Sequence, residues 1–477
     1  MSLAHTHPSA AEEIDALRTS QWWDAERMER AQFERLRLLL RHCLDFVPWY
    51  RETFTAAGVV PDHVTGPDAL RRLPMVDRST FRRYGAVLKA LTLPDGIRNT
   101  GTLSTSGSTG IPVLIAQTNL TEQKWTAFAV RDLEWCSIDP ALRLASVRNA
   151  GHSKQELEVL RSGIDLPDWG VSLRGVCRTG RSHLMEMSAA PEQQLDWLVR
   201  VDADYLLTFP SNAERLARLA ADKGVLLPNL KAVQTIGEML SAEMRAVIES
   251  SLGAPVRDTY SCCEAGYVAS PCPDGHGYHV HSENVIVEVL DDDNQPVRPG
   301  ETGRVVLTTL HNFATPLIRY DIHDYAAVGP ERCPCGRGLP LLTEIVGRQR
   351  PMFVLPSGEF ISSSPLAQGI RKVGAFLQFQ VEQTTRRHVV LRIVPGSHWS
   401  AEHSDKMLNA LHRFFGPSMD CRIECVPEIA AAPGRKLQST VISPEVTAST
   451  VPGERRATTS ENERTSASTT DDPEALP

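Results

Sequence analysis

Leu103–Pro112 reads LSTSGSTGIP, and the rest of the chain is best interpreted outward from this stretch. Its centre consists only of hydroxyl residues and glycines, namely Ser104, Thr105, Ser106, Gly107, Ser108, Thr109 and Gly110. Small residues let a backbone turn sharply and aim its N–H groups at an anion, and the hydroxyls add donors. The stretch therefore suits the phosphates of a nucleotide, although Ser/Gly runs also form ordinary surface turns. It is not a Walker A loop, because no Gly-Lys-Ser/Thr follows it.

The composition describes an ordinary soluble globular protein, with 42% hydrophobic and 23% charged residues among 477. This length allows a large core and more than one domain. A net charge of -8 argues against nucleic acid as the main partner. No apolar run reaches membrane-spanning length and the first residues lack a secretory pattern, so we expect a cytoplasmic protein without membrane contact. The ten cysteines are then expected to be metal ligands, catalytic groups or buried thiols rather than disulfides.

The N-terminal region has charged and apolar residues at helical spacing from about Ala11 to Phe54, with a break at Pro48. This pattern predicts helices that pack on the protein. Asp77 or Ser79 is the expected N-cap of a further helix.

The region after the hydroxyl-rich loop alternates strand and helix patterns. Thr121–Trp135 reads as a helix, and short apolar runs alternate with helical segments over Leu142–Leu230. Ala232–Ile236 reads as another strand, followed by a helix that Gly253 closes. Such alternation predicts an α/β fold with largely parallel sheets.

The pattern changes at Asn284, where strand, turn and strand signals predict a small antiparallel β subdomain. A further break falls at Gly347-Arg348. We therefore predict a large N-terminal domain over 1–347 and a small, mobile C-terminal α+β lid domain over 348–442, with a helix at Ser404–Phe415. The remaining residues, 443–477, have the composition of a disordered tail.

Four features follow one another in a specific order: the hydroxyl-rich loop, Tyr260 with Glu264, the segment PLIRYDIHD ending at Asp324, and Gly347-Arg348. In this order they resemble the adenylate-forming superfamily of acyl-CoA synthetases, luciferases and peptide-synthetase adenylation domains. The phenylacetate–coenzyme A ligase branch is the most similar. The resemblance runs from the VPWYR segment, which begins at Val47, to about Val441.

The resemblance implies that each motif has a role in adenylation, the reaction in which a substrate carboxylate attacks the α-phosphate of ATP. Ser104–Gly110 would hold the phosphates, and Glu264 would bind Mg²⁺ near the α-phosphate as a catalytic residue. The adenine pocket would include Gly237, Glu238 and Tyr260. Asp324 would accept hydrogen bonds from the ribose hydroxyls, with Arg348 contributing from the domain junction. A solvated or capping carboxylate is the alternative for Glu264 and for Asp324.

Lys436 lies in APGRKLQSTV and is the only lysine after Lys406. It resembles the catalytic lysine that the small domain of these enzymes carries into the ATP site. A compact ammonium there would stabilise charge on the substrate and α-phosphate oxygens. An ordinary solvated lysine is the alternative.

A second cluster consists of Cys272, His279, Cys333 and Cys335. The two thiols of Cys333-Pro334-Cys335 form a tight corner, and Cys272 and His279 could complete a closed Cys₃His site for structural zinc. Some relatives in this branch have a similar site. Reduced buried thiols are the alternative, and His281, Cys263 and His276 are substitutes if one ligand is wrong. Cys421 and Cys425 form a weaker pair without an evident partner.

Two positions depart from the pattern of the family, and the second of them bears on the acceptor of the activated group. Ile111 stands where the family has a lysine in the phosphate loop, and Arg348-Gln349-Arg350-Pro351 stands where relatives carry acidic residues at the hinge. Pro351 fixes its own φ and restricts Arg350, so hinge rotation and thioester formation are less firmly implied than adenylation.

The expected function is ATP-dependent adenylation of a small, aromatic or related acid with release of pyrophosphate, followed by acyl transfer to coenzyme A. An amine or a carrier protein is an alternative acceptor, and nitrite is an alternative substrate. A catalytically silent nucleotide-binding relative is the reading from another class. The sequence leaves the oligomeric state open, with a homodimer among the alternatives.

Overall fold

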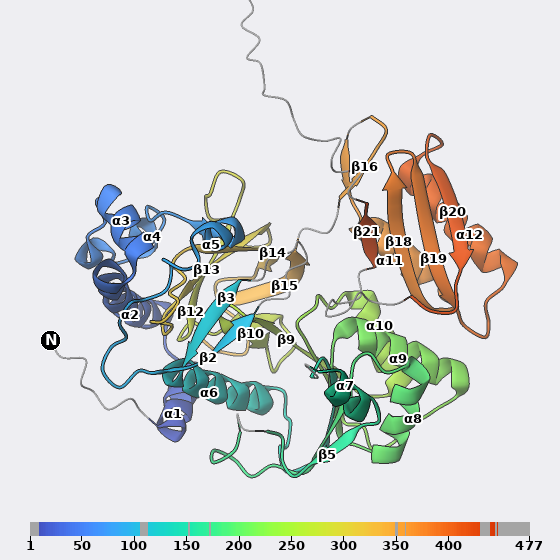
Figure 1. Cartoon of the computed structure of the whole chain (residues 1–477), viewed down its shortest axis with the longest axis horizontal. Helices are drawn as coiled ribbons and strands as arrows, with labels where there is room; N and C mark the ends of the chain where they lie inside the picture. Colours follow the sequence, from blue (N-terminus) through green and yellow to red (C-terminus); the bar gives the residue numbers. More distant parts are fainter. Residues whose placement is uncertain are drawn as a thin grey trace, which may run out of the picture.

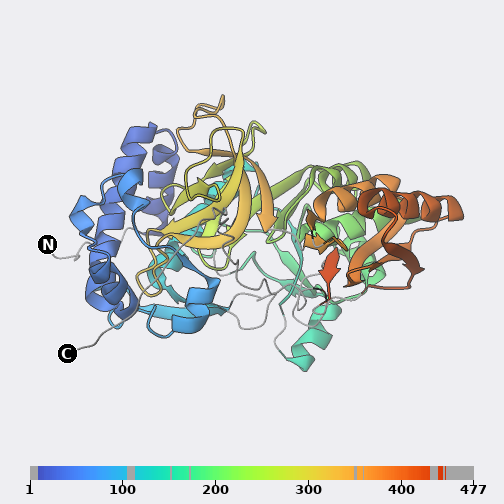
Figure 2. The ribbon, with the colours of Figure 1, turned by 90° about the horizontal axis from the view of Figure 1, so that it is seen from above.

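The computed structural model describes residues 9–104, 113–150, 153–170, 173–348, 352–357, 359–429, 439–443 and 446. Figure 1 shows N-terminal helices at one end, a central sheet, an α/β layer and a C-terminal unit beside that layer. Figure 2 shows from above that the N-terminal helices and the C-terminal unit lie at opposite ends. None of the helices in these described ranges is both long and apolar enough to cross a membrane.

The helical pattern of the N-terminal region corresponds to three helices, α1 (Ala10–Ser20), α2 (Ala25–Phe46) and α3 (Pro48–Ala56). Pro48 begins α3, because a proline at the first helical position loses no hydrogen bond and already has a helical φ. A second break precedes α2, where the Asp24 carboxylate accepts a hydrogen bond from the Arg27 N–H at 2.7 Å. Helix α5 (Arg78–Tyr84) is capped by Asp77 rather than Ser79. The other short elements here are η1 (Pro61–His63), α4 (Pro67–Leu70) and β1 (Val76–Asp77).

One sheet of 13 strands forms the centre of the molecule, in the order β12-β13-β14-β15-β11-β10-β9-β8-β7-β4-β6-β5, with β1 paired to β14. Its parallel part consists of β4 (Leu144–Arg148), β6 (Ser182–Glu186), β7 (Tyr205–Thr208), β8 (Ala232–Ile236) and β9 (Val256–Cys262). Strand β5 (Ile164–Leu166) runs antiparallel at its edge. The predicted α/β fold class is confirmed.

The antiparallel part of the sheet includes the strands predicted after Asn284. It consists of β10 (Gly266–Pro271), β11 (Tyr278–Val280), β12 (Val285–Leu290), β13 (Thr302–Thr309), β14 (Tyr320–Val328) and β15 (Leu341–Arg348). Strand β9 pairs with β8 in parallel and with β10 antiparallel, so the two parts join along it.

Helices cover both faces of the parallel part: α6 (Asn119–Trp135), α7 (Lys154–Arg161), α8 (Pro191–Val201), α9 (Pro210–Lys223) and α10 (Ala242–Leu252). Successive strand residues point to opposite faces. One face buries Val147, Leu206 and Val233 with Leu216 of α9 and Ile248 of α10, whereas the other buries Leu144, Tyr205 and Ala232 with Leu133 of α6. Gly253 closes α10 in the left-handed conformation, as predicted.

The C-terminal unit comprises the described residues from Met352 to Ser443 and has its own core. Its elements are β16 (Met352–Val354), β17 (Phe360–Ser362), α11 (Ser364–Val373), β18 (Phe376–Thr385), β19 (His388–Pro395), α12 (Ala401–Phe415), β20 (Asp420–Cys425) and β21 (Thr440–Ile442). The predicted helix at Ser404–Phe415 is thus three residues longer at its start. Apart from Ser443 and Val446, the predicted tail lies outside the described residues.

Candidate active site

The hydroxyl-rich loop joins two paired strands, β2 (Asn99–Ser104) and β3 (Leu114–Thr118). Ser104 is the last residue of β2 and pairs with Leu114, so the loop leaves and re-enters the same antiparallel hairpin. The candidate phosphate-binding residues Thr105–Gly110 lie outside the described residues, as does the candidate catalytic Lys436.

Gly237 and Glu238 directly follow β8, at the carboxyl edge of the parallel strands. Gly237 has a φ of +71°, which glycine adopts without the steric cost that other residues meet. A Glu238 carboxylate oxygen accepts a hydrogen bond from the Ser211 N–H at 3.1 Å. Met239 lies against Gly347 of β15, where a Cβ would be 3.1 Å from the Met239 Cβ. The fold therefore brings the end of β8 to the end of β15.

Tyr260 of β9 and Asp324 of β14 are joined by a hydrogen bond, with the Tyr260 hydroxyl donating to Asp324 Oδ2 at 2.9 Å. Burial, together with the Asp324 charge, raises the pKa of Tyr260, so the phenol remains protonated and can donate. Asp324 is also the register partner of Arg348 across β14 and β15. Tyr260, Asp324 and Arg348, which are all predicted for the adenosine site, thus lie on neighbouring parts of the fold although they are far apart in sequence.

Glu264 lies in the turn between β9 and β10, and its side chain is only 3% exposed. Its Oε1 is 3.3 Å from Nη2 of Arg78, the first residue of α5. The sequence analysis did not identify Arg78, and no local signal marks a partner 186 positions away. Oxygen ligands of this kind are those that Mg²⁺ prefers.

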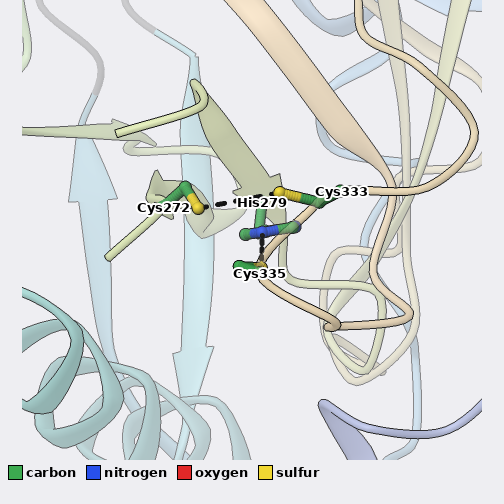
Figure 3. A group of neighbouring side chains, drawn as sticks. All are labelled: Cys272, His279, Cys333 and Cys335. Carbon is green, nitrogen blue, oxygen red and sulfur yellow. Dashed lines mark hydrogen bonds between the residues drawn. The ribbon is translucent and has the colours of Figure 1, made fainter. Parts of the chain in front are cut away.

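The four residues proposed for zinc meet in one group, whose ligand atoms all lie within 4.8 Å of one another. Figure 3 shows Cys272 after β10, His279 on β11, and Cys333 and Cys335 on the loop before β15. The Cys272 and Cys333 sulfurs are 3.8 Å apart. Two thiolates on one tetrahedral zinc, each at about 2.3 Å, would be separated by about 3.8 Å. The donor set and its spacing therefore fit zinc.

The protonation state of His279 also fits a metal site. Burial lowers the pKa of His279 to about 4, so the imidazole is neutral at pH 7. Its Nδ1 lies 3.1 Å from the Leu339 carbonyl oxygen and its Nε2 lies 3.1 Å from Cys335 Sγ. A carbonyl that binds Nδ1–H leaves Nε2 as the ligand atom. The substitute His281 instead lies with Nε2 2.9 Å from the Ser270 hydroxyl, and it is not part of the group.

The chain matches no protein-family model. It is 25% identical to a phenylacetate–coenzyme A ligase of Thermus thermophilus over 337 residues, which cover 69% of this chain and 72% of that protein. It is 26% identical to the phenylacetate–coenzyme A ligase of Escherichia coli over 388 residues, which cover 79% of this chain and 83% of that protein. The resemblance found from the ordered motifs is therefore confirmed by independent similarity along most of the chain.

Solved structures of a 2-hydroxyisobutyryl-CoA ligase have the same fold. The structure in the postadenylation state with 2-HIB-AMP gives a TM-score of 0.69 at 18% identity and covers 94% of this chain and 95% of that one. The same enzyme with 2-HIB-AMP and CoA in the thioesterification state gives 0.56 at 19% identity and the same coverage. Both comparisons show that this chain shares the fold of that enzyme.

Proposed function

We infer that this chain, a relative of the phenylacetate–coenzyme A ligases in the adenylate-forming superfamily, is an AMP-forming acid ligase. It would adenylate a small carboxylic acid with ATP, release pyrophosphate, and transfer the acyl group to coenzyme A. An aromatic acid is the substrate class that the relatives' names support. The observation that carries this proposal is the Tyr260–Asp324 hydrogen bond beside Gly347 and Met239, because it assembles adenosine-binding chemistry from four separate segments.

In this proposal Tyr260 and Asp324 position the nucleoside. The Asp324 carboxylate, oriented by the Tyr260 hydroxyl, would accept hydrogen bonds from the ribose hydroxyls. Gly237 and Glu238 would line the adenine pocket at the end of β8, and Arg348 would contribute from the end of β15. By fixing the nucleoside, these residues would keep the α-phosphate in line with the attacking carboxylate. Such positioning lowers the barrier to phosphoryl transfer.

Glu264 would hold Mg²⁺, which would supply positive charge to the phosphates. The nearby Arg78 guanidinium, 3.3 Å away, would orient the carboxylate before the metal binds. Ser104–Gly110 would bind the phosphates, and Lys436 would stabilise the charge that develops at the α-phosphate. A structural zinc held by Cys272, His279, Cys333 and Cys335 would fix the loop before β15, and therefore the strand that carries Gly347.

We propose the cytoplasm as the location, because a zinc site of this kind needs thiols that stay reduced. All ten cysteines are free, and four of them converge on the candidate zinc site.

Nucleotide product analysis tests this function. The protein is incubated with Mg-ATP and a panel of acids that includes nitrite, with and without coenzyme A. AMP and pyrophosphate with a carboxylic acid, and a thioester only when coenzyme A is present, would support the proposal. AMP with nitrite alone, or transfer only to an amine or a carrier protein, would favour the corresponding alternative. ATP binding without any AMP would favour a silent relative.

Glu264→Gln supplies the residue-level arm of the same test. We expect AMP formation to fall by about 100-fold or more, because a neutral amide is a poor Mg²⁺ ligand. Glu26→Gln is a suitable control, since Glu26 lies on the exposed surface of α2 and pairs with Arg30 of the same helix at 2.8 Å. Full activity of Glu264→Gln would contradict the assignment.

A further inference from the structure

The parallel part of the sheet contains a reversal of strand order. From β4 the chain moves to β6 on one side and then returns past β4 to β7, β8 and β9 on the other. In open α/β sheets the ligand crevice lies outside the carboxyl ends of the strands at such a reversal. Here the crevice is expected between the ends of β4 and β7.

Arg148 is the last residue of β4 and therefore stands at this reversal. Its side chain is exposed and makes no hydrogen bond or ion pair within the described parts of the chain. Surrounding protein nevertheless lowers its pKa by desolvation. Arg148 is therefore reachable from solvent at the carboxyl edge of the sheet.

The nearest acidic side chain in the strand register does not neutralise Arg148. Glu186 of β6 is its register partner, but the Glu186 carboxylate accepts a hydrogen bond from the Ala150 N–H at 2.8 Å. Glu186 therefore holds the backbone that follows β4. The guanidinium is left available to a ligand.

The opposite side of the reversal carries a hydroxyl that has no partner. Ser211, in the first turn of α9 after β7, has a buried Oγ without a hydrogen-bond partner in the described residues. Its N–H is bound to Glu238, which places Ser211 beside the end of β8. Ser211 thus begins the helix that follows β7, on the other side of the reversal from Arg148.

The crevice continues to the proposed nucleotide site. Strand β8 is two strands from β4, so its end with Gly237 and Glu238 lies about 10 Å from the Arg148 backbone. A long arginine side chain and a small acid could together span this gap. The acid's reacting carboxylate would then face the α-phosphate while its other end meets Arg148.

We propose that Arg148 binds a second anionic group of the acid substrate, so that the enzyme prefers dicarboxylic acids over monocarboxylic acids of matched size. This inference rests on the proposed adenylating function. A guanidinium without an internal partner favours a carboxylate in bidentate geometry, and such charge-assisted hydrogen bonds are stronger than neutral ones.

The test uses the full chain and matched acid pairs, valerate with glutarate and phenylacetate with 4-carboxyphenylacetate. Pyrophosphate release with Mg-ATP and hydroxylamine as a trap gives kcat/KM for each acid, so no coenzyme A is needed. We expect the dicarboxylates to be preferred. Arg148→Gln should lower kcat/KM for the dicarboxylates by about 10- to 100-fold and leave the monocarboxylates nearly unchanged. Arg148→Lys should restore part of the preference.

Arg413→Gln is the matched control, because Arg413 is exposed on α12 in the C-terminal unit. An equal preference for both acids of each pair, or an equal loss for both in Arg148→Gln, would overturn the inference while the adenylation itself stands. If none of the four acids gives pyrophosphate, although a wider panel does, the inference is also overturned. If no acid in any panel gives AMP, the proposed function fails first.

Discussion

Arg371 of α11 and Glu214 of α9 form a buried salt bridge, with Arg371 Nε 3.3 Å from Glu214 Oε1 and side chains that are 7% and 9% exposed. Arg218 donates to the same oxygen at 2.9 Å. The two arginines also lie over the rings of Phe379 and Phe376, at 5.0 and 4.3 Å from the centroids. One carboxylate therefore neutralises two cations where the C-terminal unit meets the α/β layer.

Glu214→Gln should weaken this contact by about 3 kcal/mol, because two buried guanidinium groups lose their counter-ion. Small-angle scattering should report a less compact particle than the wild type. Glu26→Gln again serves as the control. A scattering profile identical to the wild type would show that Glu214 does not hold the two parts together.

Tyr260→Phe should raise the KM for ATP by about 10-fold or more, because Asp324 loses the hydroxyl that orients its carboxylate. Tyr278→Phe is a closely matched control, since the Tyr278 hydroxyl donates to Asp258 Oδ2 at the same distance of 2.9 Å. The unfolding temperatures of the two variants should change by similar amounts, whereas only Tyr260→Phe should raise the KM for ATP. Equal KM values for both variants would count against a nucleotide role for Tyr260.

Purified protein should contain about one zinc ion per chain by elemental analysis, and a strong chelator should remove it and lower the unfolding temperature. Cys335→Ser should abolish binding, because it removes a thiolate from the four-ligand group. Cys425→Ser should bind zinc normally, since Cys425 is an exposed thiol on β20. Metal-free wild-type protein of full stability would instead indicate buried reduced thiols.

Asp132 of α6 predicts a specific pH dependence of stability. Burial raises its pKa to about 6. The hydrogen bonds that it accepts from Ser270 at 2.5 Å and Thr259 at 2.9 Å act in the opposite direction but are outweighed. The folded state therefore holds this proton more tightly than the unfolded state, whose pKa is near 3.8. As pH rises from about 4 to about 6, ionisation of Asp132 should lower the free energy of unfolding by roughly 3 kcal/mol.

Asp132→Asn should remove this dependence, because the amide oxygen can still accept both hydrogen bonds but carries no charge. Calorimetric unfolding from pH 4 to 8 measures the difference between the wild type and the variant. Asp405→Asn, at an exposed position of α12, should follow the wild-type profile. Parallel profiles for the wild type and Asp132→Asn would contradict the raised pKa.

Local sequence determined the elements whose signals are themselves local. The apolar run Ala232–Ile236 is β8 without change of bounds, and Gly253 ends α10 because it takes a left-handed conformation without steric cost. Pro48 was correctly expected to interrupt the N-terminal pattern, but the break before Asp24 was missed. The sequence marks this break only by the capping side chain of Asp24, and an analysis of hydrophobic periodicity does not detect a single capping residue.

The candidate site divides in the same way. The order of motifs, through its resemblance to a known family, predicted Tyr260, Glu264 and Asp324 as site residues. The Arg78–Glu264 pair, the Arg371–Glu214 bridge and the position of Arg148 at the strand reversal depend on tertiary structure. Partners separated by more than a hundred residues meet only when sheet order and helix packing are fixed, and no local propensity encodes that order.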